Sequence, residues 1–364
     1  MRYAILGNNI SSPVMAADLS LKGFPVTLYG GPSELLQTIK KRGGINISGV
    51  VGPGFAKIPD VTTSVKEAIK GVDIIMIDPL KEPVEQFRSN FLKPCISNIE
   101  NGQSVIFTSG YHWALEFYKK LTEARKDMDV VISEMSIGPY AGMNIVGSDL
   151  KVGGLKSVLR FASIPSRRTK NIIRIVQEAF PQTLTYMNVL ETSLNNPNHT
   201  LHSPILLCNA ARVESTGGDF LSVAEGATPS VIRLMEAFDR ERLSVIKFLG
   251  LESISMKKWL SRAYEAKGDS LYERMQDCYA YKTSKNWQKG KWGILSSDIP
   301  RGLIPTSSIA SSYGLSTPIT DMLIGLLSMI HKVDYRKNGL TLDELGLATM
   351  NRQEMIKFVT KGET

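Results

Sequence analysis

Cysteine is scarce in this 364-residue chain, and long apolar runs are missing. The three cysteines, Cys95, Cys208 and Cys278, are odd in number and far apart. They therefore indicate buried thiols of a reducing compartment rather than a disulfide framework. No apolar stretch approaches the roughly 20 residues of a membrane span, and no basic-then-apolar segment opens the chain. We therefore expect a cytoplasmic protein that does not enter a membrane.

The basic residues are not gathered into one block. The net charge is +8, but no basic run is interleaved with aromatic residues. This distribution argues against a nucleic-acid partner and favours anionic small molecules. Metal ligands are also sparse, because His199, His202 and Cys208 have no usual zinc spacing and no carboxylate beside them. We expect no metal site.

The first 30 residues predict a β-strand, a helix and a second strand. Tyr3–Leu6 is a short apolar strand, and Val26–Tyr29 is another. Between them, Pro13–Leu21 has helical periodicity, with Gly23 as its C-cap. This βαβ order opens a dinucleotide-binding domain.

The turn between strand and helix departs from the G-x-G-x-x-G fingerprint. Only Gly7 is kept, while Asn9 stands where backbone must pass close to a pyrophosphate and Ser12 stands at the third glycine. Asparagine tolerates positive φ, and Ser12 with Pro13 forms an N-cap and N1 pair. Free N–H groups at this helix start would still form an anion site. We predict nucleotide binding here; the alternative is a doubly wound domain that has lost its ligand.

No acidic residue follows the second strand to bind the ribose 2′-hydroxyl of NAD. Residues 30–32 are Gly-Gly-Pro, and residues 40–42 are Lys-Lys-Arg. The sequence therefore leans toward NADP over NAD, although the three cations also suit an ordinary solvated helix end. We expect the cofactor to contact Gly7, Asn8, Asn9, Ser11, Ser12, Arg42 and Pro79.

Strands and helices alternate up to about Pro165. Strands are predicted at residues 72–77, 104–108, 130–134 and 158–164, which indicates a mostly parallel sheet. Beyond Pro165 helix signals dominate: Thr228-Pro229 and Thr317-Pro318 begin helices, and capping boxes start at Thr341 and Asn351. We predict an α/β doubly wound dinucleotide-binding domain at residues 1–165 and an all-α substrate and catalytic domain at residues 166–364.

The segment 190–214 carries polar groups where a helix should present an apolar stripe. Asn198 and His202 are four residues apart and lie on one helical face. An amide can hold a carbonyl or imine substrate, and an imidazole exchanges protons near neutral pH. The alternative is that His202 is a satisfied core histidine and Asn198 a local cap.

Several segments together resemble the opine dehydrogenases, the family of octopine, nopaline and carboxyethyl-norvaline dehydrogenases. The most specific are the N-P-N-x-x-x-H-x-P block at Asn196–Pro204 and the D-x-P-x-G-L-x-P block at Asp298–Pro305. The resemblance extends from about Tyr3 to Leu327. It implies an N-terminal Rossmann domain and an all-helical C-terminal domain. It also implies a reaction that joins a 2-oxo acid to the amine of an amino acid and reduces the imine with NAD(P)H.

By the same resemblance, His202 is expected to be the catalytic histidine and Asp298 the carboxylate that orients it. A carboxylate on the second ring nitrogen fixes the tautomer and lets the ring carry a proton. Asn198 would bind the substrate carbonyl or carboxylate. The alternative for Asp298 is a turn residue that precedes Pro300.

Two features depart from the family pattern. The fingerprint glycines are replaced at Asn9 and Ser12, which puts cofactor affinity in doubt. An arginine that some members place before the D-x-P block is missing, since Gly293 and Ile294 stand there, and Lys291 and Arg301 are the nearest cations. We assign Arg301 to substrate binding.

Three functions stay open on the sequence alone. The leading one is an NAD(P)-dependent opine-type dehydrogenase. The second is a 2-oxo or 3-hydroxy acid oxidoreductase on the same fold, and the third is a degenerate homologue that binds a ligand without turnover. The partners are small molecules, a 2-oxo acid and an amino acid, and a homodimer stays open.

Overall fold

The computed structural model describes residues 1–31, 33–79, 83–282 and 295–362. Its contacts divide the chain into two compact units. The first contains Met1–Ser109 and Trp113–Val189, and the second contains Gly110–His112 and Leu190–Thr364. Within the described ranges, no helix is both long and apolar enough to cross a membrane.

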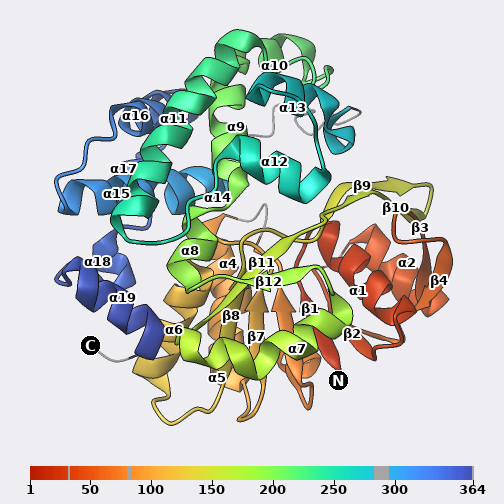
Figure 1. The fold of residues 1–364 in the computed structure, drawn as a ribbon. Coiled ribbons are helices and arrows are strands. Elements are labelled where there is room, and N and C mark those ends of the chain that lie inside the picture. Colours follow the sequence, from red (N-terminus) through yellow and green to blue (C-terminus); the bar gives the residue numbers. More distant parts are fainter. Residues whose placement is uncertain (32, 80–82, 283–294, 363–364) are drawn as a thin grey trace. The chain divides into compact units, whose positions relative to one another are not determined.

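An eight-stranded sheet forms the centre of the first unit, in the order β12-β11-β8-β7-β6-β1-β2-β5 (Figure 1). The strands from β8 to β5 are parallel, β11 is antiparallel to β8, and β12 is parallel to β11. The bounds are β1 Tyr3–Leu6, β2 Val26–Tyr29, β5 Asp60–Thr62, β6 Ile74–Ile77, β7 Ser104–Phe107, β8 Val131–Met135, β11 Leu159–Ile164 and β12 Thr183–Thr185. The predicted parallel sheet is confirmed, and the predicted strands agree within two residues at each end.

A second, four-stranded sheet was not predicted from the sequence. Its order is β4-β3-β10-β9, with β3 parallel to β10 and both outer pairs antiparallel. The strands are β3 Gly44–Gly49, β4 Gly54–Lys57, β9 Tyr140–Val146 and β10 Asp149–Leu155. Two segments almost 100 residues apart in sequence therefore build one sheet.

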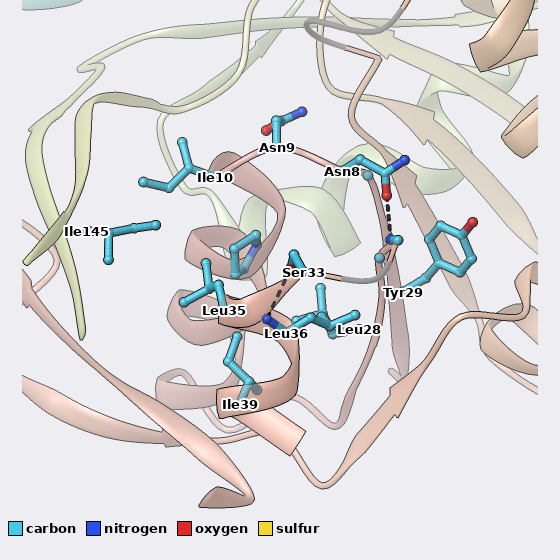
Figure 2. A pocket seen from close by; sticks show the side chains of 14 residues that line it. Asn8, Asn9, Ile10, Leu28, Tyr29, Ser33, Leu35, Leu36, Ile39 and Ile145 are labelled. Carbon is cyan, nitrogen blue, oxygen red and sulfur yellow. Dashed lines mark hydrogen bonds between the residues drawn. The ribbon is translucent and has the colours of Figure 1, made fainter. Parts of the chain in front are cut away.

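Helix α1, Ser11–Leu21, packs against strands of both sheets. Nine consecutive residues from Ser11 to Leu19 are buried. A helix covered on all sides needs no polar face, which explains why its sequence has small and apolar residues around its whole circumference. The turn that precedes α1 lies beside the turn between β2 and helix α2 (Figure 2).

The other helices of the first unit are short and flank the main sheet. Their bounds are α2 Glu34–Arg42, α3 Val65–Ile69, α4 Val84–Phe87, α5 Lys93–Asn98, α6 Trp113–Ala124 and α7 Thr169–Ala179, with a π-helical turn η1 Arg88–Leu92 and a 3₁₀ turn η2 Ser166–Arg168. Ser33 caps α2 through its side chain, which accepts from Leu36 N, and Gly43 ends the helix at φ 68°.

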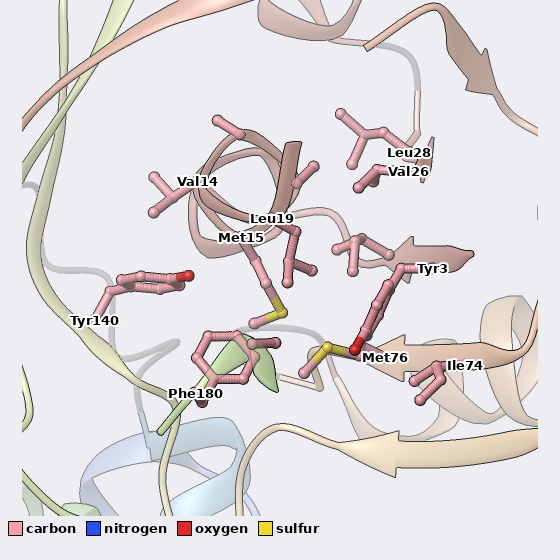
Figure 3. Packing of buried hydrophobic residues seen from close by; sticks show 14 of the residues in the cluster. Tyr3, Val14, Met15, Leu19, Val26, Leu28, Ile74, Met76, Tyr140 and Phe180 are labelled. Atoms are coloured by element: carbon pink, nitrogen blue, oxygen red, sulfur yellow. The ribbon is translucent and has the colours of Figure 1, made fainter. Parts of the chain in front are cut away.

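Apolar side chains from both sheets and α1 form the core of this unit (Figure 3). Met15 and Leu19 of α1 pack with Tyr3 of β1, Met76 of β6 and Phe180. Each is 1% exposed or less. Burying a side chain of this size contributes roughly 1.5–3 kcal/mol. This core holds β1, α1 and β2 in register, and with them the turn predicted to bind a nucleotide.

The predicted domain boundary at residue 165 was too early. Helix α7 and strand β12 continue the alternating pattern to Thr185, and the first unit extends to Val189. Ile172 and Val176 of α7 are buried in its core. The residues 110–112, which the sequence placed in the first domain, belong to the second unit.

The second unit is all-helical in the residues that are described, as predicted (Figure 1). Its helices are α8 Val189–Leu194, α9 Pro197–Cys208, α10 Ala210–Thr216, α11 Pro229–Phe248, α12 Met256–Tyr264, α13 Leu271–Asp277, α14 Leu295–Asp298, α15 Ile304–Ser312, α16 Pro318–His331, α17 Tyr335–Asn338, α18 Leu342–Leu345 and α19 Arg352–Lys361, with a 3₁₀ turn η3 Tyr279–Tyr281 and a π-helical turn η6 Ile299–Leu303.

The predicted helix starts of this unit are confirmed. Helix α11 begins at Pro229, and α16 begins at Pro318. Thr341 and Asn351 both form complete capping boxes, with Glu344 and Glu354. Each box satisfies backbone N–H groups that a helix start otherwise leaves without partners.

Candidate active site

His202 and Asp298 lie together in the second unit. His202 Nδ1 is 2.9 Å from Asp298 Oδ2. The Asp298 side chain has no exposure, and that of His202 is 11% exposed. The contact between the two side chains is therefore shielded from bulk water. The structure thus brings together the two residues that the sequence proposed as a catalytic pair.

Helix α9 places His202 among buried polar groups. The Asn196 side chain caps the helix by accepting from Asn198 N, and Pro197 occupies its first turn. His199, Thr200, His202 and Ser203 are all buried, so the helix has no solvent-facing polar stripe there. Its polar residues therefore serve the interior of the second unit.

Asp298 is the last residue of α14, directly before the π-helical turn η6. Pro300 stands in that turn and supplies no N–H, and such turns occur often at functional sites. Gly302 lets η6 approach α9 closely: a Cβ there would lie 2.8 Å from His199 Cγ. The close approach of the two elements brings Asp298 within reach of His202.

Tyr111 is a third member of the site, which the sequence analysis missed. Its hydroxyl donates to Asp298 Oδ1 at 2.5 Å and accepts from Asn198 Nδ2 at 3.2 Å. Burial, followed by the charge of Asp298, raises the pKa of Tyr111 well above its ordinary value. The phenol is therefore neutral and acts as a donor. One signal was available: Tyr111 follows strand β7, and ligands of parallel sheets bind beyond the carboxyl ends of strands.

Arg301 was predicted to bind substrate, and the structure places it in the interior of the second unit. It is 1% exposed, and its Nε donates to the Tyr111 carbonyl oxygen at 2.8 Å. Arg301 thus supports the loop that carries Tyr111. Asn198, by contrast, is only partly buried and joins the hydrogen-bonded chain through Tyr111.

Two further buried histidines differ from His202. Burial, then the charge of Arg301, lowers the pKa of His112 to about 3. Burial, followed by Arg242 and the other histidines, lowers the pKa of His199 well below its ordinary value. Both rings are neutral at physiological pH, whereas His202 alone of the three contacts a carboxylate among the residues that the structure describes, that of Asp298.

The predicted cofactor turn lies in the first unit and is held by asparagine side chains. Asn8 Oδ1 accepts from Gly31 N at 2.6 Å, which ties the end of β1 to the end of β2 (Figure 2). Asn9 Oδ1 accepts from Ser11 N at 2.8 Å and from Ser11 Oγ at 2.6 Å. The Asn9 side chain therefore satisfies the first backbone N–H of α1, whose N-cap residue is Ile10.

Two expectations for this turn were wrong. Ser12 is not the N-cap with Pro13 at N1, because α1 begins at Ser11 and places Ser12 inside the helix. Asn9 also does not adopt positive φ. Ser12 instead packs on the first glycine: a Cβ on Gly7 would lie 2.2 Å from Ser12 Oγ. Gly7 is required because Ser12 occupies the space beside it.

A cavity of about 420 Å³ opens at this turn. Its walls are mainly apolar, with Asn8 and Asn9 at the edge nearest the start of α1 (Figure 2). The lining comprises Gly7, Asn8, Asn9, Ile10, Pro13, Leu28, Tyr29, Gly30, Gly31, Ser33, Leu35, Leu36, Ile39 and Ile145. Ile145 comes from β9, so the second sheet contributes to the pocket. An apolar slot with a few polar groups, of this size, suits the adenosine part of a dinucleotide.

A second cavity of about 360 Å³ lies on the other side of Ser33. Its polar lining includes Gln37, Lys40 and Thr63. Arg42, by contrast, is bound to the β9–β10 turn, with Nη1 2.9 Å from Asp149 Oδ1 and 3.1 Å from Ser148 Oγ. Arg42 thus pairs with Asp149, and its predicted contact with the cofactor stays a prediction. Of the three predicted cations, Lys40 lines this second cavity.

Two features singled out in the sequence lie at or beyond the limits of the described residues. Pro79 is buried just after β6, and the three residues that follow it lie outside the described residues. The replacement of the family arginine at Gly293 and Ile294, and the cation Lys291, also lie outside them.

Comparison with known proteins gives consistent matches. Residues 185–331 match the family described as NAD/NADP octopine/nopaline dehydrogenase, alpha-helical domain. An opine dehydrogenase of Arthrobacter sp. (strain 1C) is 32% identical over 350 residues, which cover 95% of each chain.

Solved structures agree with the fold. An octopine dehydrogenase in complex with NADH and L-arginine has a TM-score of 0.74 at 16% identity, covering 100% of this chain and 98% of that one. A yersinopine dehydrogenase bound to NADP⁺ has a TM-score of 0.67 at 14% identity, covering 98% and 97%. At these identities the structural similarity establishes the fold alone.

Proposed function

Because this chain belongs to the opine dehydrogenase family, we propose that the His202–Asp298 pair is the acid–base centre of its reaction. The protein is an NAD(P)H-dependent oxidoreductase that acts on CH–NH bonds. It joins the amine of an amino acid to a 2-oxo acid through an imine and reduces that imine. The observation that carries the assignment is the buried 2.9 Å contact between His202 Nδ1 and Asp298 Oδ2.

The geometry separates the roles of the two ring nitrogens. Nδ1–H donates to Asp298, which leaves Nε2 to exchange a proton with the substrate. The neutral ring accepts a proton from the attacking amine. The protonated ring then gives a proton to the oxygen that leaves as water when the imine forms. NAD(P)H, when bound, supplies the hydride.

The experiment that tests this function is a screen of 2-oxo acids against amino acids. The fall in reduced-cofactor absorbance is followed, and the secondary-amine product is identified by mass spectrometry. Oxidation that requires both an amine and a 2-oxo acid is expected. Oxidation by the 2-oxo acid alone would instead favour a 2-oxo or 3-hydroxy acid oxidoreductase. Cofactor binding without any oxidation would favour a ligand-binding homologue.

The cavity residues fit a nicotinamide dinucleotide. The cavity at the β1–α1 turn has the apolar walls that an adenine needs, and Gly31 lets the backbone pass close by, where a Cβ would lie 3.1 Å from Asn8 Oδ1. The proposed contacts are Gly7, Asn8 and Asn9, which line the cavity, and Ser11 and Ser12 at the start of α1. Arg42 and Pro79 have no part in this cavity's lining.

For the choice of cofactor, we propose that NADPH binds at least as well as NADH. No carboxylate is found in the described residues between β2 and Ser33. The second cavity provides Ser33 and Lys40 for a 2′-phosphate. Its lining also contains the carboxylate of Glu67, which accepts from the Thr62 hydroxyl at 2.6 Å. Lys40→Ala should weaken NADPH binding by roughly tenfold, the effect of one lost charged hydrogen bond, and should leave NADH unchanged. Lys41→Ala is the matched control. An equal preference for NADPH over NADH in both variants would exclude Lys40 as the residue that binds the 2′-phosphate.

Asn198 and Arg301 are proposed to act on the amino-acid and 2-oxo acid substrates. Asn198 lies one helical turn from His202 and is partly open to solvent. Arg301 acts through the loop that it binds, since its guanidinium is buried against Tyr111. A preferred amino acid would be identified by the same screen.

The state of assembly and the location in the cell are proposals as well. Helix α16 exposes Met322, Leu326, Met329 and Ile330, a stripe at helical spacing, and we propose that it is the contact surface of a homodimer. Light scattering of the wild type and Met329→Lys tests this, and an unchanged mass would contradict it. We also propose a cytoplasmic location, because the three cysteines are free thiols.

A further inference from the structure

We propose that Tyr111 is a positioning residue for both ends of the site: it holds Asp298 for His202 and leaves the Asn198 amide oxygen to accept from the substrate amine. The proposal rests on the function proposed above. It concerns a residue in the second unit that comes from a loop flanked by segments of the first.

The direction of each hydrogen bond follows from counting protons. A carboxylate only accepts, so Tyr111 must give its single hydroxyl proton to Asp298 Oδ1, and His202 must donate to Oδ2. The Tyr111 oxygen can then only accept from Asn198. The Asn198 atom that faces Tyr111 must therefore be the amide nitrogen, Nδ2.

The Asn198 amide then offers two groups to a substrate. One N–H of Nδ2 donates to Tyr111, which leaves the amide oxygen and the second N–H. The proposal assigns the oxygen, which only accepts, to the amine of the amino acid, which is a donor. The contact of Asn198 with a carbonyl or carboxylate, expected from the sequence, stays a prediction for the second N–H.

The loop that carries Tyr111 is held at each of its three residues. A Cβ on Gly110 would lie 2.7 Å from the Thr192 carbonyl oxygen, and the Gly110 carbonyl accepts from Asn196 Nδ2 at 2.6 Å. The Tyr111 carbonyl accepts from Arg301. His112 N donates to Ser193 Oγ at 2.8 Å, and its φ is 60°. A side chain fixed in this way can hold two partners at once.

Tyr111→Phe keeps the buried ring and removes only the hydroxyl. We expect kcat to fall roughly 10-fold to 100-fold, the effect of losing a hydrogen bond to a charged group. KM for the amino acid should rise, while KM for the 2-oxo acid and Kd for the cofactor stay unchanged. Tyr264→Phe, a buried tyrosine of α12 outside the site, is the control.

Calorimetry of amino-acid binding without a 2-oxo acid separates this proposal from the proposed function, because it needs no turnover. The amino acid should bind Tyr111→Phe with a higher Kd than it binds the wild-type protein. If the wild type turns nothing over but this Kd rises, the proposed function fails and the positioning role holds.

An unchanged Kd together with an unchanged KM for the amino acid would overturn the proposal. If Tyr111→Phe does not fold, Asn198→Ala provides the second test. It should raise KM for the amino acid alone, since the acceptor for the amine is lost. Equal rises in KM for both substrates would contradict the preference for the amine.

Discussion

Asn9→Gly should tighten the binding of a reduced nicotinamide cofactor. The Asn9 carboxamide oxygen accepts from Ser11 N and Ser11 Oγ, at 2.8 and 2.6 Å. The Ser12 N–H points to the Asn9 carbonyl at 3.3 Å, and Pro13 has no N–H. The donors with which a helix start binds phosphate are thus taken up within the turn. A pyrophosphate must displace the Asn9 side chain before it can bind Ser11.

The expected gain follows from these two hydrogen bonds. Each contributes about 0.5–1.5 kcal/mol net, so displacing both costs roughly 1–3 kcal/mol of binding free energy. The greater backbone freedom of glycine takes back about 0.5–1 kcal/mol. The midpoints of these ranges, about 2 and about 0.75 kcal/mol, leave a net gain of about 1.25 kcal/mol, which corresponds to a Kd that is roughly 8-fold lower.

Calorimetry with NADPH and with NADH measures this gain directly. Asn9→Asp is the matched control: it keeps the acceptor for Ser11 and adds a negative charge beside the pyrophosphate, so it should bind more weakly than the wild type. A Kd for Asn9→Gly equal to or higher than that of the wild type, at an unchanged melting temperature, would refute the competition. Absence of binding by the wild type would remove the nucleotide interpretation altogether.

The remaining predictions concern the pair, its packing and its protonation. His202→Ala should lower kcat by roughly 100-fold to 10,000-fold with little change in cofactor Kd, and Asp298→Asn should cost less or similar. The kcat of the double variant should be no lower than that of His202→Ala alone, because Asp298 acts through the imidazole. Additive losses in steady-state kinetics would show that the two residues act independently. His199→Ala was expected to be mild from the sequence, but the ring is 1% exposed and packs on Gly302, so it should lower the free energy of unfolding. Gly302→Ala should destabilise by roughly 1–3 kcal/mol in urea unfolding because its Cβ meets that ring, and His199→Ala should partly rescue it. Since burial depresses the pKa of His112 to about 3, the unfolded chain binds its proton first as pH falls. The stability from a neutral His112 is therefore complete above about pH 6.5 and decreases by about 1.4 kcal/mol for each pH unit below it. Urea unfolding at pH 7.0 and pH 5.0 measures this, and His112→Gln should flatten the slope.

Local signals in the sequence predicted most of the main sheet. The βαβ opening and the strands from β6 to β11 are short apolar runs whose neighbours in space are also close in sequence order. The second sheet was missed because β3 and β4 are glycine-rich and partly exposed, and because β3 pairs with β10 about 100 residues later. No local sequence pattern predicts the pairing of strands that are so far apart in the chain.

The candidate site divides in the same way. Asn198 and His202 share a helical face, which spacing alone predicts, and Asp298 entered through a motif. Tyr111 lies 187 residues from Asp298 in the sequence, so their hydrogen bond could not be found by spacing. The role of Asn9 was missed for a different reason. By the fingerprint, Asn9 only replaces a glycine. In the structure its side chain accepts from the Ser11 N–H at the start of α1, where Ser12 was expected to be the cap.

The place of residues 110–112 matters for anyone who recombines these enzymes. The tripeptide belongs to the helical unit, yet Ser109 before it and Trp113 after it belong to the other. A chimera joined at residue 190 would take His202 and Asp298 from one parent. Residue 111, whose tyrosine donates to Asp298, would come from the other parent. Exchange of substrate range between relatives should therefore require two grafted segments, one of them only three residues long.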